Sequence, residues 1–246
     1  MTDPLAPLLA LEGVAAAGED ARTELGRAHR HRSNLRGWPA TAGEAALRAA
    51  RASSVLDGGS LSLSENGEPD PVLAGALRVS EALEGGTNAL TGVWQRAPLQ
   101  ALARLHALAA ADLVDDERLG RPRPEPEVGP RLEMLAELVT GGTNVPAFVV
   151  AAVAHGELLT LAPFGTADGV VARAVSRLIT MSSGLDPHGL GVPEMFWMKQ
   201  SGSYRAAARG FASGTPNGLG AWLVLSSQAL QAGAREALSI AQAAKG

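Results

Sequence analysis

Residues 159–173 read LTLAPFGTADGVVAR. The apolar residues before Pro163 are typical of a helix end, the small residues 162–167 of a tight loop, and Asp168 of a new helix start. Such a loop points several backbone N–H groups at one spot, where the dipole of the following helix favours an anion. The stretch therefore predicts two helices joined by a loop of the anion-binding type.

Apolar residues recur at helical spacing on both sides of this loop and through most of the chain. Alanine and leucine dominate while aromatic and β-branched residues are sparse, which favours helix over sheet. A break is predicted at Gly37-Trp38-Pro39, followed by a capping box of Thr41 and Glu44. The predicted helices cover 6–30, 41–55, 70–83, 98–111, 132–139, 146–161 and 168–183, then a helix around Phe196 and Trp197 and a terminal helix with Trp222.

Small residues and prolines mark the predicted loops. The tetrapeptide GGTN occurs at 85–88 and at 141–144, and each copy predicts a helix end followed by a helix start. Residues 60–69 are small and polar and predict a mobile loop, and residues 120–130 hold four prolines and two glycines, which predicts an extended loop. Because no strand pair and no dividing linker is recognised, the sequence predicts one all-α domain.

Composition narrows the class of protein. Of the 246 residues 46% are hydrophobic, enough for a sizeable core. The net charge of −4 and the lack of a long basic block argue against nucleic acid as a partner. There is no cysteine, which excludes disulfides and thiolate metal sites. With no long apolar run and no signal-peptide pattern, we expect a cytoplasmic protein without a membrane partner, and its richness in alanine and arginine suggests a bacterial source.

The central stretch resembles the signature of the Fic family of transferases, H-P-F-x-[DE]-G-N-G-R-x-x-R. Its frame survives in Pro163, Phe164, Gly169 and Arg173. The resemblance implies a Fic-like helical domain over 41–246, with the degenerate motif at 162–173, and an N-terminal helical extension over 1–40. Further segments support it by order and spacing, namely Ser53-Ser54-Val55-Leu56-Asp57-Gly58, residues 99–106 with the turn at 120–123, the helices 132–135 and 149–161 before the loop, and Tyr204, Trp222 and the closing helix.

The residues that carry Fic chemistry are replaced. Ala162 stands where the family has its catalytic His, and Thr166 where it has the metal-binding acid. Asp168 and Val170 stand in place of the Asn and Arg that hold phosphates. We therefore expect no catalytic residue in the motif, no metal site, and no nucleotide or Mg²⁺ as cofactor. His155 is the remaining local candidate for a general base in a pocket, or else a packed helix residue bonded to backbone.

Several charged residues allow two interpretations. Asp168 is expected to cap the second helix, where it would satisfy the N–H groups that a phosphate needs. Arg173 forms a salt bridge to a local acid such as Asp168, or else binds a ligand. The segment Ser53-Ser54-Val55-Leu56-Asp57-Gly58 resembles the inhibitory motif of family members with a regulatory helix. In them a Glu pairs with a phosphate-binding Arg, so Asp57 would pair with Arg173, or Asp57-Gly58 simply ends a helix.

Three functions follow from this comparison. The first is a Fic-like binding or regulatory protein that is inactive as an adenylyltransferase and works through its remnant groove or by association with another protein. The second is a transferase that uses the same cleft with a different phosphate-containing donor. The third is a helical domain with no function in the cleft. The target-docking flap of the family is also expected to be missing, because three of the seven residues 124–130 are proline and cannot form a hairpin.

Overall fold

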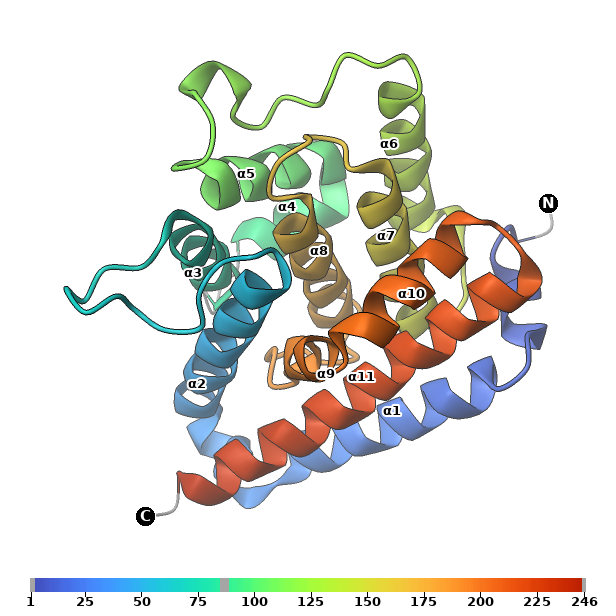
Figure 1. Ribbon diagram of the computed structural model, residues 1–246. Coiled ribbons are helices and arrows are strands. Elements are labelled where there is room, and N and C mark those ends of the chain that lie inside the picture. The colour runs from blue at the N-terminus through green and yellow to red at the C-terminus, as the bar shows by residue number, and fades with distance from the viewer. Residues whose placement is uncertain (1–2, 85–88, 245–246) are drawn as a thin grey trace.

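The protein is all-α. The computed structural model describes residues 3–84 and 89–244, and within these ranges it contains helices and no strand (Figure 1). The α-helices are α1 (Val14–Arg30), α2 (Arg32–Leu56), α3 (Pro71–Glu84), α4 (Ala89–Arg96), α5 (Pro98–Ala110), α6 (Val128–Glu137), α7 (Ala147–Leu161), α8 (Asp168–Ser182), α9 (Pro193–Lys199), α10 (Ser201–Ala212) and α11 (Pro216–Ala243). Short helical turns lie at η1 (Ala6–Ala10), η2 (Asp116–Arg118) and η3 (Leu138–Gly142).

Helices α7 and α8 lie at the centre of the molecule (Figure 1). Apolar and small residues occupy every side of α7, which is the pattern of a helix covered all round. Its residues Val149 and Leu158 and the α8 residues Val175 and Leu178 are fully buried. One face of α7 packs in a cluster with α3 to α6 and α8, and the other packs in a cluster with α1 and α9 to α11. The loop 162–167 therefore joins the two most buried helices.

The other helices surround this pair. The terminal helices α1 and α11 run side by side along one face, and α10 lies between α11 and α7 (Figure 1). Helix α2 packs against α3 and α9, and its C-terminal end reaches the N-terminal end of α8. The loop between α2 and α3 projects from the body of the molecule (Figure 1). This arrangement places a segment from the first quarter of the chain against the central loop.

The predicted break at Gly37-Trp38-Pro39 is wrong. Helix α2 begins at Arg32, after His31 as N-cap, and continues through Pro39. Proline is tolerated here because this side of the helix is exposed, so the carbonyl that loses its partner meets water. Thr41 is not an N-cap either. It is buried, and its hydroxyl donates to the Asn34 side chain at 2.7 Å.

Other elements also differ from those predicted from the sequence. Helix α4 was not predicted, and the GGTN copy at 85–88 that precedes it lies outside the described residues. Helix α11 begins at Pro216, where the Thr215 hydroxyl accepts from the Gly218 N–H and caps the helix. The predicted division at residue 40 falls inside α2. Among the described residues, no helix has the length and apolar character needed to cross a bilayer.

Candidate functional site

The loop between α7 and α8 has an unusual backbone. Ala162, Gly165 and Ala167 all have positive φ, at 44°, 72° and 55°. Ala162 and Ala167 are the only non-glycine residues in this region of φ within the described chain, and each pays a conformational cost there. Backbone strain of this kind persists only where surrounding contacts fix the backbone, and it is found most often at functional sites. The loop is therefore held in shape by its neighbours.

Arg123 supplies much of this support. Its Nε donates to the Ala162 carbonyl at 2.8 Å, and its Nη2 donates to the Leu161 carbonyl at 3.0 Å. The Arg123 backbone N–H also donates to the Pro163 carbonyl at 2.7 Å. Sequence reasoning placed Arg123 in a turn and missed this role. The sequence offers no direct signal for it, because the contact joins residues about forty positions apart.

Phe164 is the apolar anchor of the loop. Its ring is buried and stacks on His106 of α5, with ring centroids 4.1 Å apart. His106 Nδ1 accepts from the Gly120 N–H at 2.9 Å. Burial lowers the pKa of His106 to about 4, so its ring is neutral at pH 7. The predicted helix 98–111 thus places His106 against the loop. There the His106 ring packs on Phe164 and accepts a hydrogen bond from the turn at Gly120.

The N-terminus of α8 is covered by Asp57, at the C-terminal end of α2. Asp57 Oδ2 accepts from the Val170 N–H at 2.9 Å, one of the donors that a helix leaves free in its first turn. Asp57 Oδ1 lies 2.8 Å from Arg173 Nη2. A Cβ atom on Gly169 would lie 2.3 Å from the Asp57 carboxylate, so only glycine permits this approach. A carboxylate of the chain itself therefore occupies the anion position.

Arg173 is buried and has all its partners within the protein. Its Nε donates to the Ser53 hydroxyl at 2.8 Å and its Nη2 donates to the Ser53 carbonyl at 3.0 Å, while Nη1 reaches the Tyr204 hydroxyl at 3.5 Å. Burial acts to lower the pKa of Arg173, but the interactions with Asp57 and Tyr204 together outweigh it, so the pKa lies above its usual value. Of the two interpretations of Arg173, the structure shows a salt bridge, with Asp57 and not Asp168 as partner.

The remaining residues of the Ser53–Gly58 segment shape the end of α2. Ser54 is buried, and its hydroxyl has no partner within the described residues. Gly58 has φ of 87°, which turns the chain out of the helix at Asp57. Both interpretations of Asp57-Gly58 are therefore realised at once, because the helix ends there and the carboxylate pairs with Arg173.

The expectation that Asp168 caps α8 is wrong. Ala167 occupies the N-cap position, and no side chain of the motif caps the helix. Asp168 is the first helical residue, and its Oδ1 accepts from the Phe164 N–H of the loop at 2.9 Å. Burial raises the pKa of Asp168 to about 6, and the Asp57 charge adds to the rise. Thr166 lies at the edge of the same loop and is partly exposed.

His155 does not line a pocket at the loop. It is fully buried on α7, and its Nε2 lies 2.8 Å from the Tyr204 hydroxyl. The rings of Trp197 and Trp222 approach it edge-on, with centroids 4.7 Å and 5.1 Å away. Burial, helped by the charge of Arg173, holds the pKa of His155 well below its ordinary value. A neutral histidine enclosed by aromatic rings is a packing residue, which agrees with the second of the two interpretations. Its hydrogen-bond partner, however, is the Tyr204 side chain and not the backbone.

No protein-family model matches the chain, and the comparison with curated proteins finds no match. Within the described residues, no cluster of three or more His, Cys, Asp or Glu side chains could hold a metal ion. The Fic resemblance remains a prediction that depends on the motif order, on the helical fold and on the contacts around α8.

Proposed function

We propose that this protein is a Fic-like binding or regulatory protein that does not transfer AMP. The proposal depends on one observation, the Asp57 carboxylate at the N-terminus of α8, where it accepts from Val170 N–H and pairs with Arg173. An incoming phosphate needs these same donors and this same cation. It would have to displace a charge that is covalently attached and held in place by α2.

The chemistry of the loop supports the same conclusion. Adenylyl transfer by the family's route needs a general base, and Ala162 offers no titratable group. Asp168, the first residue of α8, is near enough to Asp57 at the end of α2 for the two charges to interact, so two carboxylates repel a phosphate from the same place. Val170 is buried and apolar, and adds no cation. Each of these changes disfavours the binding of a nucleotide at the loop.

The segment after Asp57 suggests how the protein contacts a partner. Leu61 and Leu63 are exposed by 50% and 47% on the loop that follows α2. The loop is closed at its base, because the Asp70 carboxylate accepts from the backbone N–H and hydroxyl of Ser60. Two exposed leucines on a held loop, a few residues after Asp57 in the chain, form a natural contact for another protein.

The nucleotide half of the proposal is tested by removing Asp57. Thermal unfolding of wild type, Asp57→Ala and the control Asp112→Ala is measured with and without phosphate and Mg-ATP. Asp112 pairs with Arg78 on the surface, so its loss removes one acid elsewhere. Only Asp57→Ala should be stabilised by the anions, because only it exposes the donors of α8. No variant should transfer label from ATP to itself or to a second protein.

Two results would overturn this half. Stabilisation of the wild type by ATP would mean that Asp57 does not close the site. Transfer of label by the wild type would favour a transferase of altered chemistry.

The proposed contact with a partner protein is tested with Leu61→Ser/Leu63→Ser. Leu35→Ser is the control, since Leu35 is 65% exposed elsewhere on the surface. A partner captured by the wild type should be lost with the first variant alone, and equal loss with both would contradict the proposal.

A further inference from the structure

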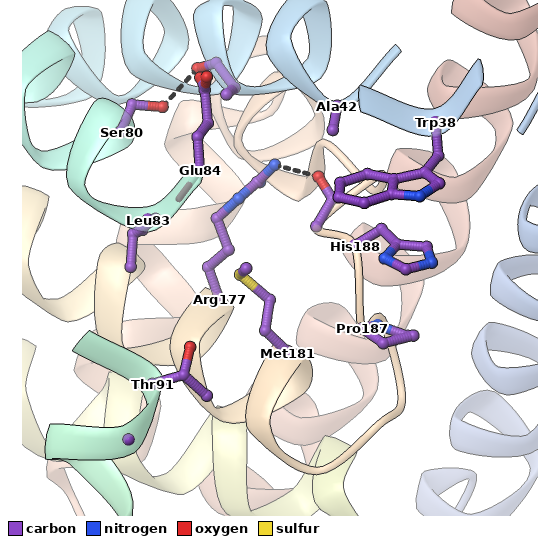
Figure 2. Close-up of a pocket in the computed structure, with 13 residues that line it drawn as sticks. Trp38, Ala42, Ser80, Leu83, Glu84, Thr91, Arg177, Met181, Pro187 and His188 are labelled. Atoms are coloured by element: carbon purple, nitrogen blue, oxygen red, sulfur yellow. Dashed lines mark hydrogen bonds between the residues drawn. The ribbon is translucent and has the colours of Figure 1, made fainter. Parts of the chain in front are cut away.

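A pocket lies away from the loop, toward the C-terminal half of α8. It has a volume of about 420 Å³ and is bordered by α2, α3, α4, α8 and the turn at residues 187–189 (Figure 2). This volume falls within the range of small-molecule sites, roughly 300–1,000 Å³. The proposed function does not involve this pocket, and none of the residues that line the pocket belongs to the loop 162–167.

A fixed cation points into this pocket. The side chain of Arg177 is only 6% exposed, and it is held by two backbone carbonyls, with Nη1 at 2.9 Å from Gly191 O and Nη2 at 2.6 Å from Gly189 O. Its acidic neighbour Glu194 is 3.5 Å away and buried. Burial raises the pKa of Glu194, which weakens it as a counter-charge. Arg177 therefore presents a pre-organised guanidinium whose Nε has no hydrogen bond within the described residues.

An acid lies near this cation at the rim of the pocket. Glu84, at the end of α3, lines the same pocket, and Figure 2 shows it above Arg177. Glu84 forms no ion pair of 4 Å or less within the described part of the chain. Partial burial raises its pKa, while the charge of Arg177 acts in the opposite direction, so the two groups interact across the space without touching.

The remaining walls are apolar or weakly polar. Trp38 and His188 stack face to face, with centroids 4.1 Å apart and planes 7° apart, and close one side of the pocket (Figure 2). Leu83 and Met181 form an apolar surface beside Arg177, and Thr91 adds a hydroxyl. Burial lowers the pKa of His188, so this wall carries little charge at pH 7.

The pair of opposite charges selects the ligand. A purely anionic ligand placed on Arg177 would meet the charge of Glu84, and a purely cationic ligand placed on Glu84 would meet that of Arg177. Only a molecule that carries both charges satisfies both groups, and the apolar wall favours a hydrocarbon side chain. We propose that this pocket binds a small zwitterion, an apolar α-amino acid, with its carboxylate at Arg177 and its ammonium at Glu84.

The test uses one amino acid and two analogues that each lack one charge. Calorimetric titrations compare L-phenylalanine with phenethylamine, which lacks the carboxylate, and with 3-phenylpropanoate, which lacks the ammonium. Each analogue loses one charge-assisted contact. Each should therefore bind more weakly than the amino acid, by roughly tenfold or more. Absence of binding by L-phenylalanine and L-leucine at millimolar concentration would overturn the proposal.

Substitution of Glu84 locates the site. Glu84→Gln should weaken L-phenylalanine and phenethylamine by roughly tenfold and leave 3-phenylpropanoate unchanged or tighter. Glu133→Gln on α6, at an exposed glutamate outside the pocket lining, is the control and should change nothing. Since Glu84 is exposed, the variant keeps its fold. If Glu84→Gln binds L-phenylalanine as wild type does, or if 3-phenylpropanoate binds as well as the amino acid, the proposal is wrong.

Discussion

Asp168→Asn should stabilise the protein at neutral pH. In the native state Asp168 is partly buried, and its Oδ1 accepts from the Phe164 N–H. The amide oxygen of Asn can accept the same hydrogen bond, so the loop keeps its contact. The substitution removes a carboxylate that burial and the nearby Asp57 charge disfavour.

The magnitude follows from the pKa of Asp168. A rise from 3.8 to about 6 corresponds to roughly 3 kcal/mol at 1.36 kcal/mol per pH unit, and solvent screening at this partly exposed side chain reduces the figure to about 1–2 kcal/mol. Because the folded pKa is the higher one, the protonated acid favours folding. Its contribution is complete below pH 3.8 and is lost as the pH rises through about 6.

Urea unfolding at pH 5 and pH 8 measures this effect. At pH 8 Asp168→Asn should exceed wild type by about 1–2 kcal/mol, and at pH 5 the difference should fall to about half. Asp112→Asn, an exposed aspartate paired with Arg78, serves as control and should show no such pH dependence. If Asp168→Asn is the less stable protein at pH 8, or if the gap does not narrow at pH 5, the ionised carboxylate stabilises the loop and the reasoning fails.

Substitutions at two positions and one titration test the contacts around α8. Asp57→Ala should cost about 2–4 kcal/mol in urea unfolding, because it leaves the buried Arg173 without its counter-charge; a loss below about 1 kcal/mol would show that the pair contributes little. Gly169→Ala should cost about 1–3 kcal/mol by pushing against Asp57, and Gly169→Ala/Asp57→Ala should fall short of the sum of the single losses. Tyr204 is the only tyrosine, and burial raises its pKa to about 12, so tyrosinate absorbance should rise only near that pH while the protein stays folded; a midpoint near 10 would contradict its burial beside His155.

Local signals in the sequence were sufficient for most helices and for the central loop. Asp70 precedes α3 and accepts from the Val72 and Leu73 N–H groups, as its residue type predicts for a helix start. Pro98 opens α5, and the apolar spacing of α8 continues to its end. These features depend on neighbours within a few positions, where hydrogen-bond geometry and helical periodicity act directly.

Tertiary contacts decided the rest. Asp57 and Arg173 were recognised as candidates, but their pairing depends on how α2 packs over α8, which no local pattern specifies. Because of the same packing, Asp57 accepts the Val170 N–H of α8. Asp168 accepts the Phe164 N–H of the loop and does not cap the helix, contrary to the expectation from its local sequence. Pro39 could stay inside α2 because that surface faces water. A residue's type limits which bonds it can form, whereas its partners depend on which distant helices exclude water beside it.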